Sequence, residues 1–247
     1  MNRGCSSVRE SNRLKTDRSF DPGSVMGSNP IIPIFSVSEA RIHAHLCGDG
    51  SVWKSKEKRS LADLRMHKRR NIFREEWKLN YTNTCEQLRD EFRNDMKKVF
   101  NRKCTKLHND LDLKANGVKH ILIKLRLLGK NSHNWFIPKE LFYSNNKIKR
   151  AWLRAFFDDE ATIDIQKKVI RLKIVNKNGL IQIQQLLLEL GINSNITGPN
   201  CDNTWFLNIR HENIFKFNNL IGFNHPKQKE KLKELIKHCL LNSIINS

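Results

Sequence analysis

The spacing of apolar residues divides most of the chain into two similar series of elements. Ser36 or Ser38 can cap a helix that runs to about Cys47, and a second helical run ends in AWLRAFFDDEATID, residues 151–164. Apolar and polar residues alternate at 77–83 and at 170–176, which predicts a strand in each series. Helical spacing follows each strand, in Leu88, Phe92, Met96, Val99 and Phe100, and in Leu180, Ile183, Leu186, Leu187 and Leu190 before Gly191.

These two series are copies of an internal repeat. HLCGDGSV (45–52) aligns without gaps with FFDDEATI (156–163), so that Asp49 lies opposite Glu160. WKLNYTN (77–83) aligns with IRLKIVN (170–176), and further strands are predicted at HILIKLR (120–126) and TWFLNIR (204–210), with Arg126 opposite Arg210. The predicted fold class is α+β, with two αββαββα half-domains related by a pseudo-twofold axis.

The domain boundaries follow from the repeat. A polar, flexible arm is expected at 1–30, with Pro30 to Ile34 as an extended lead-in, and the half-domains are expected at 31–146 and 147–247. Pro226 is placed to begin a C-terminal amphipathic helix.

The first half carries a basic insertion, KSKEKRSLADLRMHKRR, at 54–70. We predict an extended hairpin or loop that follows a phosphate backbone, with a solvated face as the alternative. Its basic residues are Lys54, Lys56, Lys58, Arg59, Arg65, Lys68, Arg69 and Arg70.

Composition makes a polyanion the expected partner. The 247 residues include 45 Lys plus Arg against 25 Asp plus Glu, a formal charge of +20. Each Lys or Arg placed on a phosphate releases condensed counterions, so nucleic acid is the favoured ligand. Six cysteines without a Cys-x-x-Cys pair argue against a zinc finger and fit a reducing compartment. No apolar stretch approaches the roughly 20 residues of a membrane span, and no secretory signal is evident.

The two opposed acids suggest a metal site. Ala44 and Gly48 share a helix face, and small residues at that spacing allow another helix to approach closely. Asp49 then emerges at the helix's carboxyl end, where the dipole is unfavourable for a carboxylate and a divalent cation would offset it. If the two helices pack side by side, Asp49 and Glu160 meet, and hard oxygen ligands suit Mg²⁺. The alternative is two ordinary helix-end acids that face water.

With these motifs, the sequence resembles the LAGLIDADG homing endonucleases of the single-chain, two-motif type. The motifs map to Ile42 through Gly50 and to Leu153 through Ala161. LRAFFDDEATI, GLIQIQQLLLELGI and IGFNHPKQKEKL resemble archaeal intron-encoded members, and the resemblance covers roughly residues 36 to 237. The sequence departs from the family pattern at Ala44, Ala155, Ala161 and Asp159, where an acid replaces a small residue of the helix contact.

The resemblance implies a saddle whose curved antiparallel sheets sit in the DNA major groove. It implies a monomer that cuts both strands of a long double-stranded site with Mg²⁺, or Mn²⁺ in its place, leaving 3′-hydroxyl and 5′-phosphate ends with short 3′ overhangs. Asp49 and Glu160 would be catalytic metal ligands, and Gly48 and Asp159 would belong to the same metal site. Asp158 and Asp159 would also support that site structurally. We expect Asp159 either to loosen the interface or to bond backbone, Lys or Arg.

Basic residues near such metals orient water or stabilise charge, and the repeat suggests Arg126 and Arg210, with Lys124 and Lys130 as neighbouring candidates. Phosphate positioning is the alternative role for them. The strand residues expected to contact DNA are Lys78, Arg171, Lys173 and Asn208. His43 and His45 point to different sides of their helix, which favours packing or surface roles, and Trp135 and Trp152 are expected in the core.

Two other functions stay open on the same scaffold: an RNA-binding maturase whose partner is its own intron RNA, and a non-catalytic DNA-binding regulator. The departures at Asp159 and Ala161 also leave room for an inactive enzyme. Because IINS lacks the terminal His-Asn of an intein, we expect a free-standing intron product. Its expected location is the archaeal cytoplasm, at the nucleoid, with an organellar host as the alternative.

Overall fold

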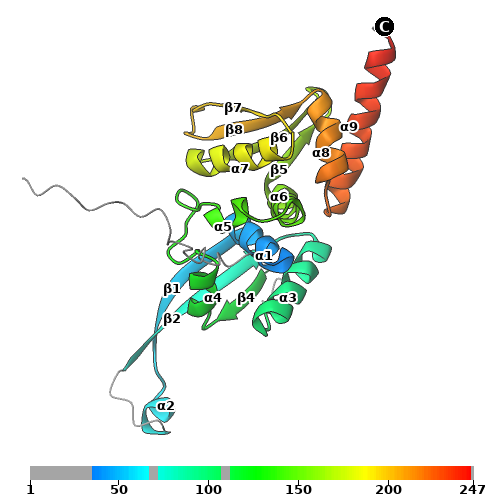
Figure 1. Ribbon diagram of the computed structural model, residues 1–247. Coiled ribbons are helices and arrows are strands. Elements are labelled where there is room, and N and C mark those ends of the chain that lie inside the picture. The colour runs from blue at the N-terminus through cyan, green and yellow to red at the C-terminus, as the bar shows by residue number, and fades with distance from the viewer. Residues whose placement is uncertain (1–34, 67–71, 107–111, 246–247) are drawn as a thin grey trace, which may run out of the picture. The chain divides into compact units, whose positions relative to one another are not determined.

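Two antiparallel sheets organise the residues that the computed structural model describes, which are 35–66, 72–106 and 112–245 (Figure 1). The first half contains α1 (Val37–Cys47), β1 (Gly50–Lys58), α2 (Leu61–Met66), β2 (Phe73–Thr82), α3 (Glu86–Phe100), β3 (Thr105–Lys106), β4 (Asp112–Asn116), α4 (Lys119–Lys124) and α5 (Lys139–Phe142). The second contains α6 (Asn146–Glu160), β5 (Ala161–Asp164), β6 (Val169–Ile174), α7 (Lys177–Glu189), β7 (Asn195–Thr197), β8 (Trp205–Arg210), α8 (Glu212–Leu220) and α9 (Pro226–Ile245). The strand orders are β1-β2-β4-β3 and β5-β6-β8-β7, so the predicted α+β repeat is confirmed.

Local signals account for where the helices start and stop. Ser36 caps α1 in a reciprocal capping box with Glu39, and Asn176 caps α7 by accepting a hydrogen bond from the Gly179 amide. Gly191, two residues after the end of α7, has a φ of +75°, a conformation that glycine adopts without a steric penalty. The predicted cap at Ser36 and the predicted start of α9 at Pro226 are confirmed.

Helices α1 and α6 pack against each other and join the two halves (Figure 1). The contact is rich in buried aromatic residues, because Trp152 and Phe156 of α6 stack at 5.1 Å between ring centroids. Trp152 Nε1 donates a hydrogen bond of 2.9 Å to Nδ1 of the buried His43. Trp135 and Trp152 therefore lie in the core as predicted, and His43 has a packing role.

The strand predicted at 120–126 is wrong. Those residues form α4 and the turn after it, and the strand in the equivalent place is β4, which pairs with β2. Burial explains the error: Ile121, Leu122 and Leu125 are buried at helical spacing, whereas Ile123, which strand alternation would also bury, is 47% exposed. The sequence of β4, DLKAN, hides its alternation because only Leu113 is a large apolar residue.

The gap-free alignment of the second strands is also wrong, by two residues. Ser51 pairs with Asn80, and its repeat partner Thr162 pairs with Arg171, so Asn80 is the counterpart of Arg171. The N-caps agree with this correction, since Cys85 rather than Asn83 precedes α3 while Asn176 precedes α7. A slip of two residues keeps every side chain on the same face of the sheet, so the apolar pattern could not reveal it.

The basic insertion lengthens one hairpin. β1 pairs with β2 along its whole length from Gly50 to Lys58, and α2 follows within the connection. The predicted extended hairpin is therefore confirmed for its described part. Lys68, Arg69 and Arg70, the arm at 1–30 and the lead-in at 30–34 lie outside the described residues.

A close contact attaches the segment between α4 and α5 to α7. A Cβ added to Gly179 would lie 2.4 Å from Trp135 Cη2, and Asn176 Nδ2 donates a 2.6 Å hydrogen bond to the Trp135 carbonyl. Glycine is needed here because the indole occupies the space of a side chain.

We predict that Gly179→Ala lowers the free energy of unfolding by about 1–3 kcal/mol, measured by urea denaturation. The sign is informative, because alanine in a helix would otherwise stabilise by up to about 1 kcal/mol. Asn178→Ala, at the exposed neighbouring position, is the matched control and should be neutral or slightly stabilising. A Gly179→Ala protein as stable as the wild type would contradict the contact.

Candidate active site

Asp49 and Glu160 converge where α1 and α6 end. Asp49 follows the C-cap residue Gly48 of α1, and Glu160 is the last residue of α6. A Cβ added to Gly48 would lie 3.0 Å from Asp159 Cβ and 3.4 Å from Glu160 Cγ. The absence of a side chain at Gly48 therefore lets the two helix ends meet, as the small-residue spacing predicts.

Burial, followed by repulsion from neighbouring acids, raises the pKa of both Asp49 and Glu160. Burial of the Glu160 carboxylate, followed by repulsion from Asp49 and Asp159, raises its pKa to about 7. Asp49 is exposed as a whole residue, but its carboxylate lies within the seam. Burial of this carboxylate, followed by repulsion from the charge of Asp159, raises the pKa of Asp49 to about 7. Each group would therefore be only partly ionised at neutral pH, and a bound cation would favour the ionised form of both.

The donor set fits a hard divalent cation. In the part of the chain that the structure describes, no group of three or more His, Cys, Asp or Glu residues could hold a metal ion. Two carboxylates alone do not make an all-protein cage, but Mg²⁺ usually keeps several waters and binds through one or two carboxylates plus phosphate oxygens. Asp49 and Glu160 would supply those carboxylates.

Asn83 orients Asp49, a role that sequence reasoning missed. Its Nδ2 donates to Asp49 Oδ2 at 2.8 Å and to Asp159 Oδ1 at 3.2 Å, while its Oδ1 accepts a 2.8 Å bond from the Cys85 amide. One amide thus links the acid of α1 with an acid of α6. Asn83 stood out in the sequence only through its alignment with Asn176, and that alignment is wrong by two residues.

Asp159 connects the halves instead of loosening their contact. Its side chain is fully buried and accepts bonds from His45 Nδ1 at 2.9 Å and from the Tyr81 hydroxyl at 2.8 Å. Burial alone would lower the pKa of His45, but the charge and hydrogen bond of Asp159, assisted by Glu91, raise it to about 10. The partners are therefore a charged histidine, a phenol and Asn83, and the expected backbone, Lys or Arg partner is wrong.

Asp158 bonds to the segment before α9 and not to Asp49 or Glu160. It accepts hydrogen bonds of 2.9 Å from the backbone amides of Asn224 and His225, just before α9. Burial is the largest influence on its carboxyl and raises the pKa to about 7. Its contacts hold the start of α9 against α6.

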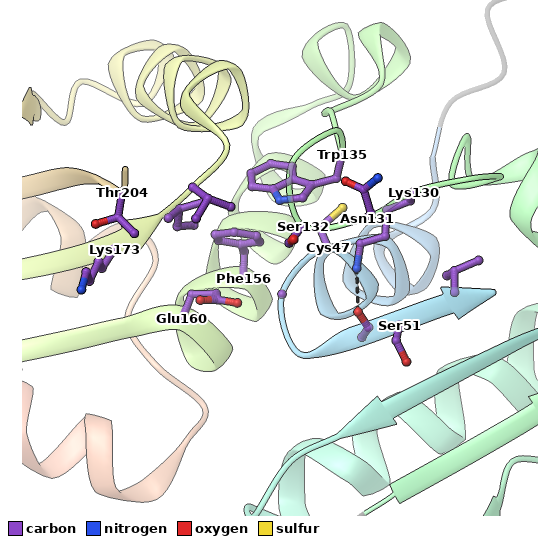
Figure 2. Close-up of a pocket in the computed structure, with 15 residues that line it drawn as sticks. Cys47, Ser51, Lys130, Asn131, Ser132, Trp135, Phe156, Glu160, Lys173 and Thr204 are labelled. Carbon is purple, nitrogen blue, oxygen red and sulfur yellow. Dashed lines mark hydrogen bonds between the residues drawn. The ribbon is translucent and has the colours of Figure 1, made fainter. Parts of the chain in front are cut away.

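Lys130 brings a positive charge to the paired acids. Its Nζ donates to the carbonyl oxygens of Leu46 and Gly50, the latter at 2.6 Å, at the carboxyl end of α1. Figure 2 shows Lys130 and Glu160 lining one cavity of about 460 Å³, to which both halves contribute. Burial lowers the pKa of Lys130, while Cys47, then Glu160 and Asp49, oppose that change.

The other three basic candidates bond elsewhere. Arg126 Nη2 lies 3.1 Å from Glu140 Oε1, Lys124 Nζ lies 2.5 Å from Glu39 Oε1, and Arg210 donates to the Lys167 carbonyl at 3.2 Å. The equivalence of Arg126 and Arg210 is wrong, because Arg126 follows α4 whereas Arg210 ends β8. Their catalytic roles stay predictions, and Lys130 is the candidate that lies beside Asp49 and Glu160.

The predicted DNA contacts divide between two faces of the sheets. Arg171, Lys173 and Asn208 lie on the face of the second sheet opposite the buried Ile170, Leu172, Leu207 and Ile209, and Asn208 is itself buried on that face. In the first sheet, Lys78 lies on the corresponding face but is buried against Glu57. Lys54, Lys56 and Lys58 alternate onto the side of Val52, so they do not share the face of Ser51 and Asn80.

Several basic residues of the hairpin contact other residues of the protein. Lys54 forms an ion pair with Glu75, and Lys56 lies 4.9 Å from the centroid of the Phe73 ring. Arg59 lies between β1 and α2 and donates its backbone amide to the Ile72 carbonyl, and Arg65 is exposed on α2. The prediction that these residues follow phosphates stays a prediction.

We predict that Asp49→Asn raises the melting temperature of the metal-free protein more at pH 8 than at pH 5. The folded-state pKa of about 7 exceeds 3.8, the ordinary pKa of an aspartic acid, so the wild-type folded state loses stability as the pH rises from about 4 to about 7. The mutant lacks this loss, so the difference should grow with pH. Calorimetry in EDTA measures it, with Asp164→Asn on β5 as a control. An equal difference at both pH values would contradict the raised pKa.

A double-mutant cycle tests the buried pair of His45 and Asp159. Removing either partner alone should destabilise the fold by roughly 3 kcal/mol, because the other charge is left buried and unpaired. His45→Ala combined with Asp159→Ala should lose less than the sum, with a coupling of about 1–3 kcal/mol in urea titrations. The more exposed pair of Asp90 and Arg93 on α3 is the control, with an expected coupling below about 0.5 kcal/mol. Additive effects at the seam would contradict the pair.

Comparisons with known proteins agree with the fold described above. Residues 147–222 match the family model of the LAGLIDADG-like domain. A structure of the homing endonuclease I-DmoI in complex with DNA and Mn superposes with a TM-score of 0.56, at 19% identity, over 75% of this chain and 97% of that one. Full-length WhiA from Thermatoga maritima gives a TM-score of 0.50 at 12% identity, over 84% of this chain and 62% of that one.

Curated relatives match over a small share of their length. A replication factor C small subunit from Methanocaldococcus jannaschii is 30% identical over 171 residues, which are 65% of this chain and 9% of that protein. The corresponding subunit of Thermococcus kodakarensis is 24% identical over 64% of this chain and 19% of its own length. The family match and the fold confirm the predicted resemblance: residues 147–222 carry a LAGLIDADG-like domain, and the chain has the fold of the LAGLIDADG homing endonucleases.

Proposed function

We propose that this chain is a site-specific DNA endonuclease that hydrolyses one phosphodiester bond in each strand of a duplex with divalent metal ions. The observation that carries the proposal is the convergence of Asp49 and Glu160 at the seam of α1 and α6, each with a pKa raised to about 7. Carboxylates placed in this way suit Mg²⁺ or Mn²⁺. The products would have 3′-hydroxyl and 5′-phosphate ends with short 3′ overhangs.

Each residue of the seam has a proposed task. Asp49 and Glu160 would hold the metal, and Asn83 keeps the Asp49 carboxylate in one orientation through its 2.8 Å bond. A divalent cation, when bound, lowers the pKa of water and neutralises charge on a phosphate. Lys130 adds a positive charge at the carboxyl end of α1, in the cavity that Glu160 also lines, where it would stabilise charge that develops on the scissile phosphate.

Charge and sheet geometry support duplex DNA as the substrate. The net charge of +20 favours a polyanion, and the open faces of the two sheets carry polar and basic side chains suited to base edges. β1 has nine residues and β5 has four, so the first hairpin extends further by about 16 Å, or roughly five base pairs. The DNA site should therefore be longer on the side of the first half.

I-DmoI, whose structures include complexes with DNA and Mn and with target DNA and Mg, supports a metal-dependent nuclease. The similarity to WhiA supports the alternative of a non-catalytic DNA-binding protein on the same scaffold. Such a protein has no need for Asp49 and Glu160 to meet. An RNA-binding maturase is a further alternative, which binding to intron RNA without DNA cleavage would favour.

We predict that Asp49→Asn and Glu160→Gln each reduce double-strand cleavage by about 100-fold or more, because each removes a charge needed to hold the metal. The substrate is the uninterrupted DNA that spans the insertion site of its own gene, incubated with Mg²⁺, and sequencing of the cut ends tests the overhangs. Binding measured by gel shift in Ca²⁺ should remain within a few fold of the wild type.

Glu189→Gln is the matched control, since Glu189 lies at the end of α7 and pairs with Lys149 at 2.7 Å. This variant should cut at the wild-type rate. Full Mg²⁺-dependent cleavage by Asp49→Asn or Glu160→Gln would exclude our assignment of the ligands. Specific DNA binding by the wild type with no cleavage under any divalent metal would favour the non-catalytic alternative.

A further inference from the structure

Arg171 occupies the centre of the open face of the second sheet. It lies in β6, between Thr162 on β5 and Asn208 on β8. Its chain neighbours Ile170 and Leu172 are fully buried on the opposite face, whereas Arg171 is half-buried among the polar side chains. A side chain at this place would face the base edges if the sheet entered a major groove.

Two neighbours, Asn208 and Phe206, hold the guanidinium in one orientation. Arg171 Nε donates to Asn208 Oδ1 at 2.9 Å, and Asn208 Nδ2 in turn donates to Thr197 Oγ1 at 3.4 Å. The guanidinium carbon lies 4.8 Å from the centroid of the Phe206 ring. Because the recorded hydrogen bond uses Nε, the edge formed by the two terminal nitrogens is left for another acceptor.

Arg171 also differs from its neighbours in charge pairing. Lys173, on the same face, forms an ion pair with Asp202 at 2.6 Å, and Lys78 of the first sheet pairs with Glu57. Within the described residues, Arg171 forms no ion pair with a carboxylate. An arginine that is fixed by an amide and an aromatic ring but keeps its charge unpaired is ready to bind a planar pair of acceptors.

The first half lacks this arrangement. Asn80, the counterpart of Arg171 by strand register, donates from Nδ2 to Thr82 Oγ1 at 3.1 Å and to Asp112 Oδ1 at 3.2 Å. Its Nδ2 group is therefore committed to side chains of its own sheet. Any base reading by a positioned arginine at this level of the repeat belongs to the second half alone.

We infer that Arg171 is a specificity-determining residue that reads one guanine in the half-site bound by the second sheet. Its two terminal nitrogens would donate to O6 and N7 of the base, the acceptor pair that guanine presents in the major groove. Asn208 and Phe206 are positioning residues that hold the guanidinium in the plane of that base. The inference rests on the proposed binding of duplex DNA and adds to it the base that one residue selects.

The test is affinity selection from a pool of randomised duplexes in Ca²⁺, followed by competition binding with each base pair of the selected site replaced in turn. The wild type should prefer guanine at one position by about 5- to 150-fold. Arg171→Ala should lose that preference and leave the other positions unchanged. Arg171→Lys, which keeps the charge but not the planar pair of donors, should lose most of it, and Phe206→Leu should weaken it.

Lys216→Ala is the matched control, because Lys216 is exposed on α8, away from the sheet face, and its loss removes the same charge. Its base profile should equal that of the wild type. Circular dichroism and melting temperature verify that every variant is folded.

Two results would overturn the inference alone: an unchanged base profile in Arg171→Ala, or a uniform loss of affinity across all duplexes with a salt slope reduced by about 1, which is the behaviour of a phosphate contact. A wild type that binds no duplex would instead overturn the proposed function, and the reading of guanine with it. The two failures are therefore distinguishable in one series of measurements.

Discussion

The packing of α1 against α6 is the contact on which the candidate site depends. Gly48 leaves no side chain between the helix ends, since an added Cβ would lie 3.0 Å from Asp159 Cβ. The same contact buries the pair of His45 and Asp159, which spans the two halves at 2.9 Å. Burial of such charges is favourable only when they are paired. The helix contact that brings Asp49 and Glu160 together therefore requires that both buried charges stay paired.

The two halves share a fold but contribute different residues to the candidate site and to the proposed DNA contacts. The first half supplies Asn83, which orients Asp49, and the longer hairpin of β1 and β2. The second half supplies the positioned guanidinium of Arg171 and the acid Asp159, which accepts bonds from residues of the first half. Lys130 lies in the first half, between α4 and α5, and reaches the carboxyl end of α1. A repeat that has diverged in this way suits an asymmetric partner better than a palindromic one.

Much of this arrangement could be predicted from the sequence, because its signals are local or repeated. The caps and the apolar spacing located α1, α3 and α7, and the two copies of the acidic motif placed Asp49 opposite Glu160. The strand β4 was missed because alternation is weak in five residues with few apolar side chains. The two-residue register error could not be detected, since strand faces repeat every two residues. Asn83 and Lys130 depend on tertiary contacts, with sequence separations of 34 and 80 residues to Asp49 and Gly50, that spacing does not encode.

The central claim is that Asp49 and Glu160 share a divalent cation at the helix seam. An anomalous difference map from crystals of the protein soaked in Mn²⁺ tests it most directly, because the metal itself gives the signal. Our account predicts a peak within about 2.3 Å of a carboxylate oxygen of each acid. A map with Mn²⁺ bound elsewhere and no peak between these two side chains would contradict it.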